Sequence, residues 1–427
     1  MRETNPVKRC VRVLGPGLVT GASDDDPSGI GTYAMAGASF GYGMLWTALV
    51  TFPLMASIQL ICARIGRVYG CGLAGVMRQH YPRTLVYVAV LSLVIANTIN
   101  AAADLAAIAA GVNLLLPIPI AFLILPIGLF ILAVQVWGSY RFIAKTFKWL
   151  TLSLFAYIGA SFFAGPDWHG VLKGTLFPTL TFDKSFLMMF VAILGTTISP
   201  YLFFWQANQE VEEDIAHGSK ELWQRKGATD SELTDVAWDV NIGMFLSNVV
   251  MYFIMLATAA TLHQAGRTDI ATAAEAAQAL RPLAGDMAFL LMALALIGTG
   301  VLAVPILTGS AAYAVAETFG WKSGLDEKPG GAKQFYLVMG ISTLVALFIA
   351  YWEIDVMKAL FWTAVINGFL SPPLLVIIML IANNRAIMGK RVNTRTLNVL
   401  GWTTSFVMFA AAIALVATWG NSGQYLK

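Results

Sequence analysis

Charged residues are scarce in this chain: Asp, Glu, Lys and Arg make up 12% of its 427 residues, about half the share found in soluble proteins. Hydrophobic residues supply 58% of the sequence, and no hydrophilic stretch is long enough to form a soluble domain beside them. The composition therefore excludes a water-soluble globular protein and predicts an all-α polytopic membrane protein.

Cysteine and histidine are also rare, with three and four residues. Cys10, Cys62 and Cys71 follow neither a metal-binding nor a disulfide spacing. The histidines fall at the ends of apolar runs or between them, so none is placed for a proton relay inside the membrane. The apolar runs hold no nucleophile–base pair and no phosphate loop, which argues against a membrane enzyme. The first run contains Gly15–Gly17 and several acids, so we do not expect a cleavable signal peptide.

The apolar runs predict about eleven membrane-spanning helices in one transmembrane domain over residues 1–427. The expected spans are 12–38, 43–66, 84–113, 117–136, 144–165, 185–216, 238–262, 287–316, 335–354, 357–382 and 397–419. Most of the 27 Lys and Arg fall on the cytoplasmic side if the N-terminus is cytoplasmic, which predicts that orientation in a multi-pass protein of the plasma membrane. The hydrophilic stretch from about Glu210 to Asp235 is interpreted as a solvated cytoplasmic linker.

The first expected span contains three consecutive acids, Asp24, Asp25 and Asp26, followed by Pro27. Acids inside a membrane are costly and are functional by default. Pro27 lacks an N–H, and Ser-Gly follows it, so the helix should break here. The freed carbonyls and the carboxylates would form an all-oxygen pocket suited to a hard cation. The alternative interpretation is that the helix ends early and the acids lie at the membrane surface.

The sixth expected span contains a second proline, Pro200, directly after small hydroxyl residues. Breaks in the first and sixth spans predict two five-helix halves in opposite orientation, at about 12–165 and 185–382, with an extra helix at about 397–419. This is the LeuT-type 5+5 inverted repeat, in which the transport site lies where the broken helices 1 and 6 meet. The alternative is that Pro200 only kinks one helix.

Four motifs resemble the Nramp (natural resistance-associated macrophage protein) family of divalent-metal transporters. Gly15–Gly17 and Asp26–Gly29 look like the family's Gly-Pro-Gly lead and Asp-Pro-Gly-Asn break. Ala103–Ala106 is similar to its Thr-Asp-Leu-Ala segment, and Gly195–Pro200 to its Gly-Ala-Thr-Ile-Met-Pro break. The resemblance runs from Leu14 to about Ala382 and implies a metal site between the two breaks.

The departures from these motifs bear on the metal. Gly29 stands where the family has Asn, Ser199 where it has a metal-binding Met, and Thr196 where it has Ala. Tyr201 replaces a His, and Ala107 replaces a Glu. A thioether favours softer transition metals, so a hydroxyl in its place leaves oxygen ligands. Gly29 and Ser199 are also expected to enlarge the pocket, which suits Mg²⁺ with much of its water shell. This pattern resembles a branch of the family related to magnesium transport.

The resemblance and the acids together define the candidate residues. The predicted metal site comprises Asp26, Gly29, Thr196, Ser199, Asp24, Asp25 and Asn367, and Asp104 is the candidate for a proton or second-cation pathway. Asn367 is included because the family places a metal-facing amide in the tenth span. The remaining asparagines of the spans are interpreted as polar contacts between helices.

Three functional hypotheses follow. The first is a secondary transporter of Mg²⁺ and/or Mn²⁺ that works by alternating access with weak or absent proton coupling. The second is a proton-coupled Mn²⁺/Fe²⁺ importer, in which Asp104, or Asp24 and Asp25, accepts the proton. The third is a Na⁺-coupled amino-acid transporter of the same fold, which the three acids oppose because they would repel a substrate carboxylate. We expect divalent metal ions and the lipid bilayer as partners, with no nucleic acid, no cofactor and no obligate protein partner.

Overall fold

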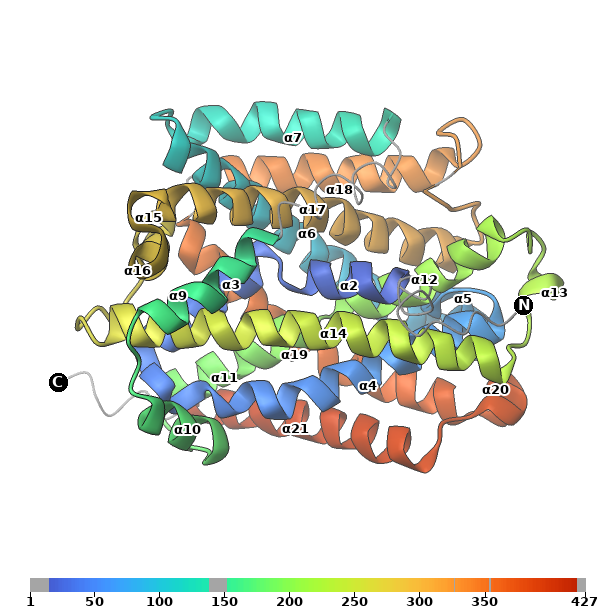
Figure 1. Cartoon of the computed structure of the whole chain (residues 1–427). Coiled ribbons are helices and arrows are strands. Elements are labelled where there is room, and N and C mark those ends of the chain that lie inside the picture. The colour runs from blue at the N-terminus through green and yellow to red at the C-terminus, as the bar shows by residue number, and fades with distance from the viewer. Residues whose placement is uncertain (1–14, 138–151, 326, 353–354, 421–427) are drawn as a thin grey trace, which may run out of the picture.

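The structure, a computed structural model, describes residues 15–137, 152–325, 327–352 and 355–420. These residues form helices joined by loops, with no strand among them (Figure 1). The helices are α2 Pro16–Asp24, α3 Pro27–Phe40, α4 Trp46–Tyr69, α5 Leu73–His80, α6 Arg83–Leu115, α7 Ile120–Trp137, α9 Ala156–Phe163, α10 Trp168–Leu176, α11 Lys184–Thr197, α12 Pro200–Ala216, α13 Leu222–Arg225, α14 Asp230–Thr258, α15 Ala273–Ala277, α16 Arg281–Ala284, α17 Ala288–Phe319, α18 Lys333–Tyr351, α19 Val356–Asn383, α20 Arg385–Met388 and α21 Arg395–Gly420. Short helical turns are η1 Gly41–Met44, η2 Leu152–Phe155, η3 Ala259–His263, η4 Gln278–Leu280, η5 Gly285–Met287 and η6 Gly389–Arg391.

Nine segments of the described chain are long and apolar enough to cross a membrane. They contain α4, α6, α7, the α11–α12 pair, α14, α17, α18, α19 and α21. The first predicted span corresponds to α2 and α3, whose 9 and 14 residues are each too few to span alone. The fifth predicted span lies partly outside the described residues, and its described part holds α9. The prediction of an all-α multi-pass membrane protein is confirmed.

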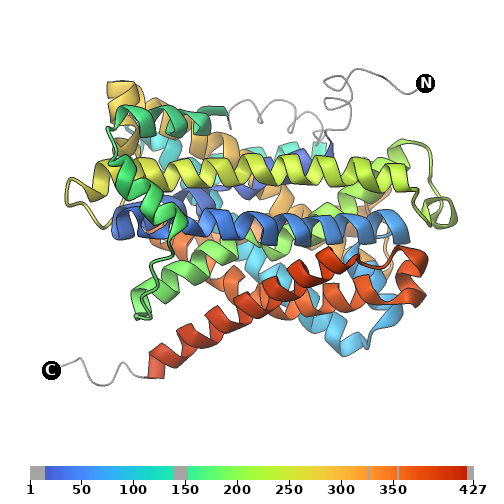
Figure 2. The same ribbon diagram turned by 60° about the horizontal axis from the view of Figure 1, so that its bottom comes forward.

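Large apolar side chains on the outer helices are exposed. Phe122 of α7, Phe348 of α18 and Phe406 of α21 keep 74%, 62% and 72% of their surface accessible. In a membrane these side chains meet lipid chains, so their exposure carries no hydrophobic penalty. Figures 1 and 2 show α14, α4 and α21 running side by side along one flank of the bundle. The broken helices lie inside this shell, and α2 and α3 pack against α14.

The first predicted break lies between α2 and α3. Asp26 precedes Pro27 in an extended conformation, and its carboxylate accepts the N–H of Gly29 at 2.7 Å. Pro27 occupies the first position of α3, where a missing N–H leaves no hydrogen bond unmade. The same acid that the sequence assigns to a metal therefore also caps the helix that follows the break.

The second predicted break lies between α11 and α12. Ser199 is extended, and Pro200 begins α12. The next residue, Tyr201, places its hydroxyl 3.0 Å from the carbonyl oxygen of Ser23, the second-last residue of α2. The two breaks are therefore in direct contact, as the inverted-repeat prediction requires.

The predicted start of the seventh span at residue 238 is wrong, because α14 begins at Asp230. Thr229 and Glu232 form a reciprocal capping box at its first turn, with the Thr229 N–H 2.8 Å from the Glu232 carboxylate. Capping residues are polar, so they extend a helix beyond the apolar window by which a span is recognised.

The prediction of a solvated linker from Glu210 is also wrong at its beginning. α12 continues to Ala216, and the Glu210 side chain is 1% exposed. It accepts a hydrogen bond from the amide of Gln206 at 3.0 Å and lies 3.8 Å from Arg67 of α4. Gln206 in turn accepts from the Thr20 hydroxyl of α2 at 2.5 Å. Gln206 therefore binds one carboxylate oxygen of Glu210, and the other oxygen is buried next to Arg67 without a hydrogen-bond partner among the described residues.

Candidate metal site

Asp26 lies where three helices meet. Its Oδ2 atom accepts from the Tyr201 hydroxyl of α12 at 3.1 Å and from the Asn100 amide of α6 at 3.4 Å. Its Oδ1 atom accepts from Gly29 within α3. The residue is 1% exposed. Its partners are neutral, so the charge of a buried carboxylate remains uncompensated unless a cation or a proton joins it.

Asp104 adds a second buried carboxylate from α6, one helical turn beyond Asn100. It has no exposed surface, and neither of its oxygens has a hydrogen-bond partner among the described residues. It lies on the same face of α6 as Asn100, which donates to Asp26. A bare buried carboxylate is costly, so Asp104 is suited to hold a proton or to share a cation with Asp26.

Gly29 and Thr196, two residues of the predicted site, are neighbours across the two breaks. A Cβ atom on Gly29 would lie 3.3 Å from the Thr196 hydroxyl oxygen and 3.3 Å from the carbonyl oxygen of Asp24. Thr196 is 1% exposed. The Gly29 backbone is therefore packed against its surroundings, and the missing side chain does not by itself leave a large space. This differs from the expectation that Gly29 enlarges the pocket.

Asn367 lies beside the second break. The backbone of Gly195 packs directly on Ala364 and Gly368 of α19, so the turn that carries Asn367 contacts the end of α11. Asn367 is 2% exposed, and its amide nitrogen has no partner within the described part of the chain. The structure therefore places the predicted amide next to the break that carries Thr196.

Ser199 also lies at the second break, but its hydroxyl faces its own chain. The Oγ atom lies 2.9 Å from the carbonyl oxygen of Gly195 and 2.7 Å from that of Thr196, so it donates back to the last turn of α11. A serine hydroxyl that donates its proton keeps lone pairs for a cation. The residue is 1% exposed, and its oxygen is a hard ligand.

Asp24 and Asp25 have a partner different from that of Asp26. The hydroxyl of Ser247 on α14 lies 2.7 Å from Asp24 and 3.2 Å from Asp25. The two acids are 0% and 4% exposed. They share this α14 contact, whereas Asp26 contacts α6 and α12, so the three consecutive side chains do not converge on one point.

The described residues contain no group of three or more His, Cys, Asp or Glu side chains arranged to hold a metal. A cation at Asp26 would instead be held by one or two carboxylates and by neutral oxygens. Two contributors were not predicted, Tyr201 and Asn100. Tyr201 directly follows the break proline, and Asn100 precedes Asp104 by four residues on the same helix face. These two spacings, to the break proline and to Asp104, are the sequence features from which Tyr201 and Asn100 could have been predicted.

Comparison with known proteins decides the family. The family model described as "Natural resistance-associated macrophage protein-like" (Nramp) matches residues 17–418. The chain belongs to the Nramp family. Nramp proteins are membrane transporters, so this Nramp chain is a transporter and not an enzyme.

One relative of this Nramp chain is the divalent metal cation transporter MntH of Klebsiella pneumoniae (strain 342). It is 26% identical over 400 residues, which cover 91% of this chain and 90% of the relative. The solved manganese transporter of Eremococcus coleocola, in complex with an aromatic bis-isothiourea substituted compound, has a TM-score of 0.79 at 19% identity and covers 100% of this chain and 91% of its own. MhsT in complex with L-phenylalanine has a TM-score of 0.55 at 13% identity, over 95% of this chain and 98% of its own. These structures show a shared transporter fold.

Proposed function

We propose that this Nramp protein transports divalent metal ions, Mg²⁺ and/or Mn²⁺, across the plasma membrane by alternating access, with proton coupling weak or absent. The observation that carries the proposal is Asp26, a buried carboxylate at the contact of the two helix breaks, whose hydrogen-bond donors Tyr201, Asn100 and Gly29 are all uncharged. The relative named as a divalent metal cation transporter and the solved manganese transporter support a divalent cargo.

The choice of metal rests on ligand chemistry. Thr196, Ser199 and Asn367 offer hydroxyl and amide oxygens beside the second break. Mg²⁺ and Mn²⁺ both accept oxygen ligands, whereas discrimination in favour of a softer metal requires sulfur or nitrogen. Because position 199 holds serine rather than methionine, the site has no thioether ligand with which to discriminate against Mg²⁺.

Alternating access is supported by burial. Asp26, Asp104, Thr196 and Ser199 are each at most 1% exposed. At the N-terminal end of α2, the carboxylate of Asp239 on α14 accepts three backbone N–H groups, at 2.6–3.1 Å. A metal ion reaches a site closed in this way only if helices move. We propose that this end of the bundle faces the cytoplasm.

One observation favours the second candidate, a proton-coupled Mn²⁺/Fe²⁺ importer. Asp104 is buried without a hydrogen-bond partner in the described residues, as a group that exchanges a proton would be. The two candidates differ in whether protons enter with the metal, and this difference is measurable.

The test is uptake of Mg²⁺, Mn²⁺ and Ca²⁺ into proteoliposomes, with internal pH recorded. We expect Mg²⁺ and Mn²⁺ to enter without stoichiometric acidification. Asp26→Asn should be inactive, and Asp286→Asn, which changes an acid whose side chain is 99% exposed, should match wild type. Acidification in proportion to Mn²⁺ uptake would establish the proton-coupled importer. Failure of a monodisperse protein to move any divalent metal would overturn the proposal.

A further inference from the structure

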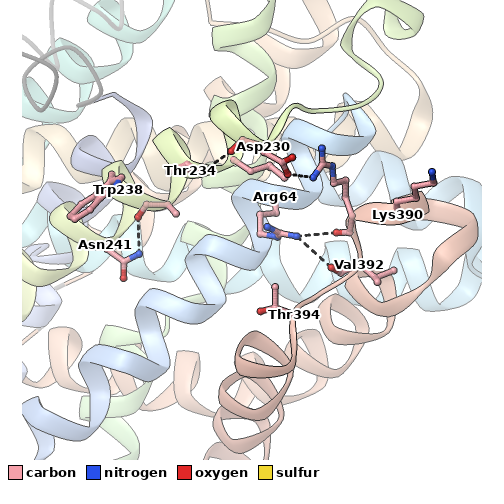
Figure 3. Close-up of a pocket in the computed structure, with 11 residues that line it drawn as sticks. Arg64, Asp230, Thr234, Trp238, Asn241, Lys390, Val392 and Thr394 are labelled. Carbon is pink, nitrogen blue, oxygen red and sulfur yellow. Dashed lines mark hydrogen bonds and ion pairs between the residues drawn. The ribbon is translucent and has the colours of Figure 1, made fainter. Parts of the chain in front are cut away.

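A cavity of about 590 Å³ lies on the flank of the bundle, remote in sequence from the two helix breaks (Figure 3). Its walls come from the first turns of α14, the last turns of α4 and the segment that joins α19 to α21. Its polar lining consists of Arg64, Asp230, Thr234, Asn241, Lys390, Arg391 and Thr394. The volume falls within the range of roughly 300–1,000 Å³ that is typical of ligand pockets.

The cavity carries an excess of positive charge. Arg391 pairs with Asp230, which neutralises both. Arg64 donates to the carbonyl oxygens of Arg391 and Val392, at 3.0 and 3.4 Å. These carbonyls orient the guanidinium but do not neutralise it. The Nε atom of Arg64 is buried without a partner, and Lys390 is exposed without an ion pair, among the residues that the structure describes. Two cations therefore remain uncompensated.

The polar wall of the cavity adjoins two exposed aromatic side chains of α14, Trp238 and Phe245, called the Trp238–Phe245 stripe below. Thr234, Trp238, Asn241 and Phe245 follow one another at spacings of three and four residues, so the polar and the aromatic side chains lie on one face of α14. Trp238 is 61% exposed and Phe245 is 52% exposed. Tryptophan is enriched where a membrane meets water. Over about three helical turns, this face passes from a basic pocket to a surface suited to lipid chains.

We infer that this cavity binds the phosphate-bearing headgroup of an anionic membrane lipid, with the acyl chains along the Trp238–Phe245 stripe. Arginine meets phosphate oxygens with its planar donor fork, and lysine supplies a compact positive charge. Basic pockets between membrane helices recognise lipid headgroups in this way. A soluble phosphate would match the charge equally well, but it would make no use of the adjoining apolar stripe. The inference does not depend on which metal the protein transports.

The test is native mass spectrometry of the full-length protein in detergent, titrated with phosphatidylglycerol and, separately, with phosphatidylcholine. We expect phosphatidylglycerol to bind more tightly. Lys390→Gln should weaken its binding about fivefold, and the Arg64→Gln/Lys390→Gln pair about 25-fold. Asp230→Asn should strengthen binding, because it releases Arg391 from its ion pair. Phosphatidylcholine binding should not change in any variant.

Lys328→Gln is the matched control, because Lys328 is an exposed lysine outside this cavity. The inference is overturned if Lys390→Gln and Lys328→Gln have the same effect, or if Asp230→Asn weakens binding. A further arm adds millimolar inorganic phosphate. If phosphate binds without lipid and displaces phosphatidylglycerol, the occupant is a soluble anion and the lipid assignment fails. If the double variant does not fold, the comparison of Lys390→Gln with Lys328→Gln still tests the inference.

Discussion

Replacing Asp26 separates its two roles, because the carboxylate both caps α3 and provides a charge at the contact of the breaks. Asp26→Asn keeps one oxygen in the place of Oδ1, which accepts the Gly29 N–H at 2.7 Å, whereas its NH2 group replaces Oδ2, which accepts from the Tyr201 hydroxyl at 3.1 Å. Asp26→Ala removes the acceptor as well. Asn and Asp are equivalent as N-caps, whereas Ala costs about 0.5–2 kcal/mol. Both variants should lose metal transport, but only the Ala variant should lose the cap.

Metal that binds only the folded protein raises its free energy of unfolding. At a metal concentration of about 100 times the dissociation constant, binding stabilises wild type by about 2.7 kcal/mol. Asp26→Asn should lose most of this metal-dependent stabilisation. Without metal it should be at least as stable as wild type, because it removes a buried charge whose hydrogen-bond partners are all neutral. The Asp26→Ala variant should have a lower Tm than the Asp26→Asn variant, because it also lacks the cap of α3.

The assay is a thermal-unfolding titration with Mg²⁺ and Mn²⁺ on purified wild type, Asp26→Asn and Asp26→Ala, alongside uptake into proteoliposomes. Asp286→Asn serves as the control for loss of an exposed acid. If Asp26→Asn transports at the wild-type rate and shows the same metal-dependent shift in Tm, the cation does not bind at Asp26. If the two Asp26 variants melt together, the capping role is refuted even when transport is lost.

Three further outcomes are expected. Ser199→Met should favour Mn²⁺ over Mg²⁺ by about 1–3 kcal/mol, because it adds a soft ligand at the second break; an unchanged Mg²⁺ block of Mn²⁺ uptake would contradict this. Asp104→Asn should raise the KM for metal several-fold and abolish any proton flux that accompanies uptake. If the KM and the internal pH during uptake both match wild type, Asp104 has no role in metal binding or in proton transfer. Asp239→Ala should leave the backbone N–H groups of Gly15, Gly17 and Leu18, at the start of α2, without their acceptor; a buried unsatisfied group costs about 1–3 kcal/mol. It should therefore increase labelling of a cysteine placed in α2 from that side of the membrane, and labelling equal to wild type would show that the cap does not hold α2 closed.

Several features of this protein followed from the sequence because their causes are local. Pro27 and Pro200 lack the N–H that a continuous helix needs, so each break is dictated within a few residues. The low charge and the long apolar runs require membrane spans irrespective of how the helices pack. Asp26 directly precedes the first break proline, so the sequence alone was enough to place it at the break.

The partners of the acids were decided by tertiary structure. Asp24 and Asp25 adjoin Asp26 in the chain, yet they share Ser247 of α14. Asp26 instead meets Tyr201 of α12, which is 175 residues away. Consecutive residues at a break point in different directions, and the sequence does not state which helix lies in each direction. For this reason the sequence did not indicate that Asp24 and Asp25 have a different partner from Asp26.

The sequence also did not indicate which polar side chains are buried. Glu210 belongs to an acidic stretch whose composition is typical of a solvated segment, yet it is 1% exposed because Gln206 and Arg67 lie beside it. A charged residue is stable inside a bundle only when other elements bring partners to it. The chain by itself therefore determined its spans, its two breaks and the acid at their centre, whereas the packing of α4, α6, α12 and α14 determined which atoms surround that acid.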